Sequence, residues 1–259
     1  MTTRTTAPAG APCWADLWTS DVAGSRRFYA ELFGWRAEEP DPNFGGYFMF
    51  TRDGVAIAGA MGDMGEAKAN NTWKPYLATE DIAKTLAVAE AEGGQVVVPA
   101  MPVGDAGIQA LLIDPTGAAI GVWQPLQFPG FTVLDEPGAP SWFELHTRDY
   151  ARALEFYRSV FGWDLTTVGD TDSFRYSTVA NPAGAGEVAG IMDASGFLPE
   201  GIPAQWGIYW HVDDVQAACT KAGELGGSVI MGPDETPYGC LAVVTDPAGA
   251  QFRLRKPNA

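Results

Sequence analysis

The chain has 259 residues, of which 46% are hydrophobic and 12% aromatic, so it is long enough for two domains with ordinary cores. Its formal net charge of −16 argues against nucleic acid and against an anionic membrane surface as partners, because both require a basic protein surface. The three cysteines, Cys13, Cys219 and Cys240, have no CxxC spacing, which favours reduced thiols and a cytoplasmic location.

A short tail precedes the first structural elements. Residues 1–11 contain no apolar core of a signal peptide, and we expect them to form a disordered tail. A strand is expected over Trp14–Thr19, and Asp21 then stands where the N-cap of a helix belongs. Apolar residues at i, i+1, i+4 and i+5 across 28–33 predict one helix face, which Gly34 ends.

The next elements complete one module and begin another of different sequence. Strands are expected over Tyr47–Thr51 and Val55–Met61. A new strand then leads to Asp81, a helix runs to Gly93-Gly94, and three further strands follow, the last after a DPTG turn at Asp114. Both modules therefore have the order βαβββ.

Both modules then occur a second time. The segment PCWADLWTSDVAGSRRFYAELFGW from Pro12 is repeated from Pro140 at a constant offset of 128, with eleven of 24 positions identical. The second copies repeat the signals of the first: N-cap residues Asp149 and Asp214, helix ends Gly162 and Gly226-Gly227, strands Phe174–Val179 and Glu187–Met192, and a DPAG turn at Asp246. The expected fold class is α+β, with four βαβββ modules in two domains.

The domain boundaries follow from the repeat and from stretches rich in Gly, Pro and small polar residues. The expected ranges are 12–125 for the first domain (modules 12–61 and 73–125), 126–139 for the linker, and 140–257 for the second domain (modules 140–193 and 205–257).

A helix carrying FYxxxFGW after an Asp cap, followed by a closing DPxG strand, resembles the vicinal oxygen chelate superfamily. That superfamily includes glyoxalase I, extradiol dioxygenases, fosfomycin-resistance proteins and bleomycin-binding proteins. The resemblance extends from Pro12 to Pro257 and implies that pairs of modules form cup-shaped mixed sheets with ligands on the concave face. Cups made from adjacent modules and cups made by exchanging modules are both open possibilities.

The resemblance also implies where metal ligands would lie: seven residues before each helix-capping Asp and seven residues after the Asp of DPxG. The residues at those positions are Trp14, Lys74, Gly121, Trp142, Gly207 and Arg253. None of them is a plausible ligand of a divalent cation, and lysine or arginine would repel one. The remaining position falls in apolar stretches near 60–61 and 191–192. We therefore expect no metal and no other cofactor.

The two-residue period of a strand places further residues on the same face as those positions. The candidate ligand-binding residues are Trp14, Asp16, Trp18, Lys74, Tyr76, Trp123, Trp142, Tyr209 and Arg253. The candidate catalytic residues are His146, His211 and Glu144. The two histidines occupy matching positions in modules that could share a cup.

Each group of candidates has a structural alternative. The tryptophans either fill the space of a lost metal or form a wall on which a flat ligand stacks. Asp16 and Glu144 either form internal ion pairs with Lys74 and Arg253 or accept hydrogen bonds from a ligand. The histidines could be structural, could contact substrate, or could form a displaced two-His-one-carboxylate metal site with Glu144.

The leading hypothesis is a metal-free protein, monomeric or homodimeric, that binds a bulky aromatic small molecule. It would act in sequestration, in antibiotic resistance, or beside a biosynthetic enzyme of an antibiotic-type metabolite. The alternatives are a metal-independent lyase, isomerase or hydroxylase using His146 or His211 as acid/base, and an interaction protein with vestigial sites.

Overall fold

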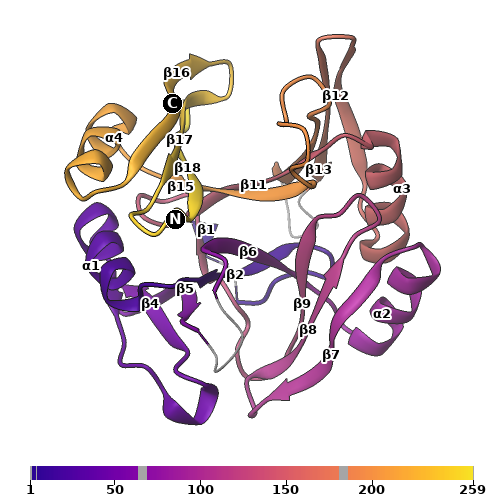
Figure 1. Ribbon diagram of the computed structural model, residues 1–259. Helices are drawn as coiled ribbons and strands as arrows, with labels where there is room; N and C mark the ends of the chain where they lie inside the picture. The colour runs from indigo at the N-terminus through magenta and orange to yellow at the C-terminus, as the bar shows by residue number, and fades with distance from the viewer. Residues whose placement is uncertain (1, 4, 64–68, 181–185, 259) are drawn as a thin grey trace.

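Two eight-stranded mixed sheets form the body of the protein (Figure 1). The computed structural model describes residues 2–3, 5–63, 69–180 and 186–258. The strand order is β3-β4-β5-β2-β6-β9-β8-β7 in the first sheet and β12-β13-β14-β11-β15-β18-β17-β16 in the second. The α+β class with two cup-shaped domains is therefore confirmed.

The bounds of the elements are as follows. The first sheet contains β2 (Pro12–Trp18), β3 (Arg36–Ala37), β4 (Phe48–Arg52), β5 (Val55–Met61), β6 (Thr72–Ala78), β7 (Gln95–Val103), β8 (Gly107–Ile113) and β9 (Ala119–Pro125). The second contains β11 (Pro140–Thr147), β12 (Leu165–Thr171), β13 (Phe174–Ala180), β14 (Glu187–Asp193), β15 (Gln205–His211), β16 (Ser228–Thr236), β17 (Gly239–Thr245) and β18 (Gln251–Lys256). The helices are α1 (Val22–Phe33), α2 (Ile82–Ala91), α3 (Tyr150–Phe161) and α4 (Val215–Glu224), with a short 3-10 helix over Pro42–Phe44.

Adjacent modules share a sheet. In the first sheet β2 and β6, the opening strands of the two modules, pair antiparallel, and each also pairs parallel with the last strand of its own module. The second sheet repeats this arrangement around β11 and β15. The possibility that modules are exchanged between the two cups is therefore settled in favour of adjacent modules.

The capping residues that bound the two long helices act as expected. Asp21 accepts a hydrogen bond from Gly24 N at 2.8 Å, and Asp149 accepts one from Arg152 N at 3.2 Å. Gly34 and Gly162 end these helices with φ of 71° and 66°, in the left-handed region that favours glycine.

The two domains meet through the repeated motifs. Figure 1 shows α1 beside α4 and α2 beside α3. The Trp35 indole donates to the carbonyl of Gly138 at 2.8 Å, and the Trp163 indole donates to the carbonyl of Gly10 at 2.7 Å. Gly138 lies 128 positions after Gly10, so the two contacts are related by the internal repeat. The tryptophan of each FGW motif thus donates a hydrogen bond across the domain interface.

The described residues of the N-terminal segment are ordered, contrary to the expectation of a disordered tail over residues 1–11, of which Met1 and Arg4 lie outside the described residues. Thr2–Thr3 pair with Val133–Leu134 as strands β1 and β10, and Ala7 and Ala11 are buried. The tail is held because its glycine carbonyl is an interdomain hydrogen-bond acceptor. None of the helices in the described ranges has the length and apolar character that crossing a membrane requires.

Candidate functional site

A buried carboxylate forms the centre of the second cup. Glu144 on β11 accepts hydrogen bonds from the hydroxyls of Tyr176 and Tyr209, each at 2.9 Å. Its Oε1 also lies 2.7 Å from His146 Nε2 and 3.2 Å from a guanidinium nitrogen of Arg253. The internal ion pair expected between Glu144 and Arg253 is present. The buried charge of Glu144 is compensated by the guanidinium and by the further hydrogen bonds from Tyr176, Tyr209 and His146.

These contacts set the protonation states. Burial opposes ionisation of Glu144, but the hydrogen bond from His146 and the charge of Arg253 outweigh it and lower its pKa to about 2. Burial, followed by the Arg253 charge, lowers the pKa of His146. Glu144 is therefore an anion and His146 a neutral imidazole near pH 7. Nε2 of His146 then donates to Glu144, and Nδ1 accepts from Arg253 at 3.0 Å.

The first cup also has a buried carboxylate beside tyrosines and one cation. Its cation, Lys74, lies on β6, whereas Arg253 of the second cup lies on β18. Asp16 accepts hydrogen bonds from the hydroxyl of Tyr47 at 2.8 Å and from the indole of Trp14 at 3.0 Å. Burial raises the pKa of Asp16, although hydrogen bonds from Tyr76 and Tyr47 and the charge of Lys74 partly offset this effect. Burial likewise lowers the pKa of Lys74. Asp16 and Lys74 are directly paired across β2 and β6 and interact electrostatically.

Two glycines stand at the positions where the other cup has its cation. A Cβ at Gly207 would lie 2.1 Å from a nitrogen of the Arg253 guanidinium. A Cβ at Gly121 would lie 2.2 Å from the Tyr76 ring. Gly207 is thus the counterpart of Lys74, and Gly121 that of Arg253. Each cup has one cation and one glycine at these two positions; the glycine leaves space for the Arg253 guanidinium in the second cup and for the Tyr76 ring in the first.

The cups differ in what covers their first-strand tryptophan. In the first cup the linker returns across Trp14, placing the Phe128 ring edge-on at 4.8 Å and the Phe131 ring at 5.2 Å. Trp14 is buried, and Trp123 on β9 donates to the Phe128 carbonyl at 3.0 Å. Trp14 and Trp123, two of the predicted ligand-binding residues, therefore both contact the linker. Trp18 donates to the carbonyl of Gly62 at 2.9 Å.

In the second cup the corresponding tryptophan is only half-buried. Trp142 donates to the hydroxyl of Tyr176 at 2.9 Å, and the guanidinium of Arg255 lies 5.8 Å from its ring centre. Tyr209 lies under the guanidinium of Arg253 at 5.1 Å. The predicted residues Trp142, Tyr209 and Arg253 are therefore brought together with Glu144.

A cavity of about 490 Å³ opens beside this cluster. Phe174, Met192 and Phe197 supply apolar wall, and Arg175, Asp193 and Ser195 supply polar groups. The Phe174 ring stacks on Tyr176 at 5.8 Å, and the Phe197 ring meets His146 edge-on at 5.1 Å, so two wall residues of the cavity contact the Glu144 cluster, whose own residues do not line it. Its volume and mixed lining are typical of a small-molecule site.

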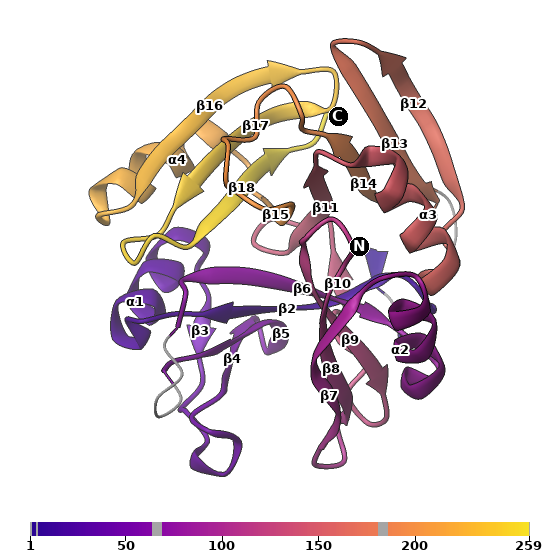
Figure 2. The ribbon, with the colours of Figure 1, turned by 45° about the vertical axis from the view of Figure 1, so that its right-hand side comes forward.

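Phe197 lies on the connection between β14 and β15, which enters the second cup between its two halves (Figure 2). Arg148 fixes this connection by donating to the carbonyls of Leu198 at 2.8 Å and Ile202 at 2.6 Å, and also to that of Pro199. Sequence reasoning missed both Phe197 and Arg148, because the connection carries no periodic pattern. It also missed Tyr47 and Tyr176, which are 129 positions apart and so do not align at the offset of 128, although their hydroxyls take equivalent places over Gly59 and Gly190.

His211 does not join the Glu144 cluster. In the antiparallel pair β11–β15, His146 lies opposite Gln205, six residues and about 20 Å along the strand from His211. Each histidine lies near the C-terminal end of its strand. Because β11 and β15 run antiparallel, these ends lie at opposite edges of the strand pair, and the two histidines are far apart. His211 Nδ1 instead lies 3.6 Å from Asp135, at the domain interface.

The donor set in the cups does not fit a divalent cation. Lys74 and Arg253 would repel one, and the oxygens of Glu144 already accept from tyrosine, histidine and arginine. Across the described part of the chain, no group of three or more His, Cys, Asp or Glu side chains is placed to hold a metal ion.

Comparison with known proteins matches this architecture. The family model of the Glyoxalase/Bleomycin resistance protein/Dioxygenase superfamily matches residues 13–122 and again residues 140–254. Among solved structures, the Mn(II)-bound glyoxalase from Novosphingobium aromaticivorans is similar with a TM-score of 0.64 and 16% identity, covering 95% of this chain and 82% of that one. The dioxygenase LapB from Pseudomonas sp. KL28 is similar with a TM-score of 0.65 and 16% identity, covering 98% and 94%. These two likenesses show the fold alone.

Two relatives are similar over almost their whole length. "Putative glyoxylase CFP32" of Mycobacterium tuberculosis is 38% identical over 254 residues, covering 96% of this chain and 95% of that protein. "Anthracycline biosynthesis protein DauV" of Streptomyces sp. is 35% identical over 262 residues, covering 95% and 92%.

Proposed function

Because the chain belongs to the Glyoxalase/Bleomycin resistance protein/Dioxygenase superfamily, we propose that it uses a cup of that fold to bind a planar aromatic small molecule. The proposed site is the cavity of the second cup, and no metal takes part. The observation that carries the proposal is the placement of two phenylalanines, Phe174 and Phe197, in the wall of a cavity of about 490 Å³.

The polar centre favours binding over chemistry. Both nitrogens of His146 are engaged, one by Glu144 and one by Arg253, so neither is free to take a proton from a ligand. The pKa of the Tyr176 hydroxyl is raised by burial and then by the Glu144 charge, which keeps it protonated. The centre is therefore a rigid polar group behind the cavity wall, and the rings of the cavity supply the contact surface.

The names of relatives support a place in small-molecule biosynthesis. DauV and a second Streptomyces protein, DnrV, which is 34% identical, are both named anthracycline biosynthesis proteins. Anthracyclines contain fused rings, and a flat ring system suits a site bounded by phenylalanine rings. We therefore propose an accessory role in which the protein holds or removes an aromatic intermediate for a biosynthetic enzyme.

Calorimetric titration with a dihydroxyanthraquinone tests the binding proposal. Phe197→Ala should weaken binding about tenfold, because it removes both a ring contact and buried apolar area. Phe44→Ala is the matched control, since Phe44 is an exposed phenylalanine of the first domain. Equal affinity of the wild type and Phe197→Ala, or no saturable binding by the wild type, would contradict the proposal.

The pair formed by His146 and Glu144 at 2.7 Å favours one alternative, a metal-independent enzyme with His146 as acid/base. Incubation of a bound ligand with wild type and with His146→Gln distinguishes the two. Turnover that disappears in His146→Gln while affinity is retained would establish the enzyme, and an unchanged ligand supports the binding role.

A further inference from the structure

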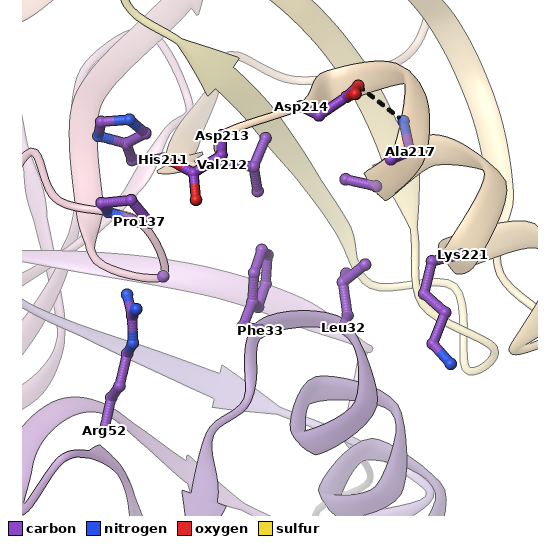
Figure 3. A pocket seen from close by; sticks show the side chains of 12 residues that line it. Leu32, Phe33, Arg52, Pro137, His211, Val212, Asp213, Asp214, Ala217 and Lys221 are labelled. Atoms are coloured by element: carbon purple, nitrogen blue, oxygen red, sulfur yellow. Dashed lines mark hydrogen bonds between the residues drawn. The ribbon is translucent and has the colours of Figure 1, made fainter.

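A second pocket lies between the domains, away from the cavity of the second cup (Figure 3). Its volume is about 350 Å³. One wall comes from the first domain, with Leu32 and Phe33 at the end of α1 and Arg52 at the end of β4. The opposite wall comes from the second domain, where Val212 and Asp213 precede α4. A molecule bound here would contact both domains at once.

The floor of this pocket is apolar. Phe33 and Val212 are each 8% exposed, and Leu32 packs beside them. The surface is large enough for a small aliphatic or aromatic group, whose burial would favour binding. A purely polar ligand would leave this surface unused.

The charged groups at the rim are divided into those with partners and those without. Lys221 pairs with Glu31 at 3.2 Å, and Asp214 caps α4 by accepting from Ala217 N at 2.9 Å. His211 lies beside Asp135 at 3.6 Å.

Asp213 is an exposed carboxylate that no hydrogen bond or ion pair joins to another residue in the ranges that the structure describes. Arg52 has Asp53 at 3.8 Å, but that carboxylate is 92% exposed and such a pair contributes little.

Figure 3 shows the Arg52 guanidinium and the Asp213 carboxylate turned toward the same hollow from opposite sides. Arg52 reaches this place across Gly138, where a Cβ would lie 2.8 Å from its terminal nitrogen. The glycine turn therefore makes room for the arginine. The pocket presents one cation, one anion and an apolar surface next to them.

From this arrangement we propose that the interdomain pocket binds an apolar α-amino acid as a zwitterion. Its carboxylate would accept from Arg52, its ammonium group would donate to Asp213, and its side chain would lie on Phe33, Leu32 and Val212. A simple carboxylate is disfavoured because Asp213, Asp214 and Asp135 would repel it. A simple amine would leave Arg52 without an anion. The pocket does not depend on the proposed aromatic site.

Titration calorimetry of the intact chain with L-phenylalanine and L-leucine tests the proposal. Saturable binding of either is expected. N-acetyl-phenylalanine, which lacks the cation, and phenethylamine, which lacks the anion, should each bind at least tenfold more weakly. Arg52→Gln and Asp213→Asn should each weaken binding about tenfold or more, as expected for loss of one charge-assisted hydrogen bond.

Asp53→Asn is the matched control, since it removes a neighbouring exposed carboxylate and should leave affinity within about twofold. Circular dichroism establishes that each variant is folded. The proposal is overturned if the wild type shows no saturable binding at millimolar concentrations, or if Arg52→Gln and Asp213→Asn bind as the wild type does. It is also overturned if N-acetyl-phenylalanine or phenethylamine binds as tightly as phenylalanine. Phe197→Ala, which tests the aromatic site, should not change this affinity, so the two proposals can fail separately.

Discussion

The hydroxyl of Tyr29 lies 3.2 Å from the carboxylate of Asp246, a residue 217 positions further along the chain. Tyr29 belongs to the FYxxxFGW motif of the first domain, and Asp246 opens the DPxG turn of the second. The converse contact joins Tyr157 to Asp114 at 2.9 Å. The two most regular motifs of the repeat therefore meet each other across the domain interface.

Replacement of Tyr29 should destabilise the whole protein rather than one domain. Tyr29→Phe removes the donor to buried Asp246 and also the acceptor of the Trp73 indole, which lies 2.9 Å from the hydroxyl. Leaving buried polar groups unpaired costs about 1–3 kcal/mol. Urea unfolding should show one transition shifted to lower denaturant.

Tyr238→Phe provides the control, because Tyr238 is an exposed tyrosine and its loss should leave the midpoint unchanged. A loss of stability in Tyr29→Phe no larger than that of Tyr238→Phe would contradict the prediction. Two separate transitions in the wild type would show that the domains unfold independently.

The ionised Glu144 should contribute stability that is lost in acid. Its pKa in the folded protein is about 2, below the ordinary value of 4.5. A lowered carboxyl pKa stabilises the fold above the ordinary pKa, and this stabilisation disappears as the pH falls from 4.5 toward 2. Linkage puts the effect at about 3 kcal/mol.

The measurement compares unfolding free energies of wild type and Glu144→Gln across that range. The difference between them should shrink as the pH falls. Burial raises the pKa values of Asp16 and Asp246, which act in the opposite direction, but both residues are present in each protein and cancel. Glu38→Gln, at an exposed position, controls for removal of one carboxylate. A difference that stays constant with pH would rule out this role of Glu144.

The sequence was sufficient for the modules and their caps, because a repeat at constant offset shows the same Asp and Gly signals twice. Strand alternation also placed Glu144, Tyr209 and Arg253 on one face, where the structure brings them together. Alternation could not show that the linker returns over Trp14, since that contact depends on the path of Phe128 and Phe131 in three dimensions.

The expectation that His146 and His211 lie at matching positions of one cup was wrong for a different reason. Counting from equivalent positions ignores strand direction, and β11 and β15 run antiparallel, so His146 and His211 lie far apart. The cavity of the second domain was missed because Phe197 lies on a connection without periodicity. Its position is fixed by Arg148, whose carbonyl partners are 50 or more residues away.

Gly207 should be intolerant of even a methyl group. Gly207→Ala would place Cβ 2.1 Å from the Arg253 guanidinium, which has little room to move because it is buried and bonded to Glu144 and His146. Overpacking of this kind costs about 1–3 kcal/mol. Thermal unfolding should show a lower midpoint.

Gly196→Ala is the matched control in the same domain, because a Cβ there meets nothing within 4 Å. It should unfold as the wild type does. If Gly207→Ala were as stable as Gly196→Ala, the packing of Arg253 against this glycine would not be a constraint on the second cup.

Arg148 should control how well the connection that carries Phe197 is ordered. Arg148→Ala removes the donors to the carbonyls of Leu198, Pro199 and Ile202, while the sheet beneath is unchanged. Hydrogen exchange at the amides of residues 197–202 should accelerate about tenfold, equivalent to about 1.4 kcal/mol of local stability. Global unfolding should change little, because the connection is largely exposed.

Since Phe197 would lose its fixed position against His146 in Arg148→Ala, affinity for dihydroxyanthraquinone should fall together with the protection of these amides from exchange. Arg158→Ala, an exposed arginine on α3, should alter neither quantity. Faster exchange with unchanged affinity would show that Phe197 does not need to be held in place to bind the ligand.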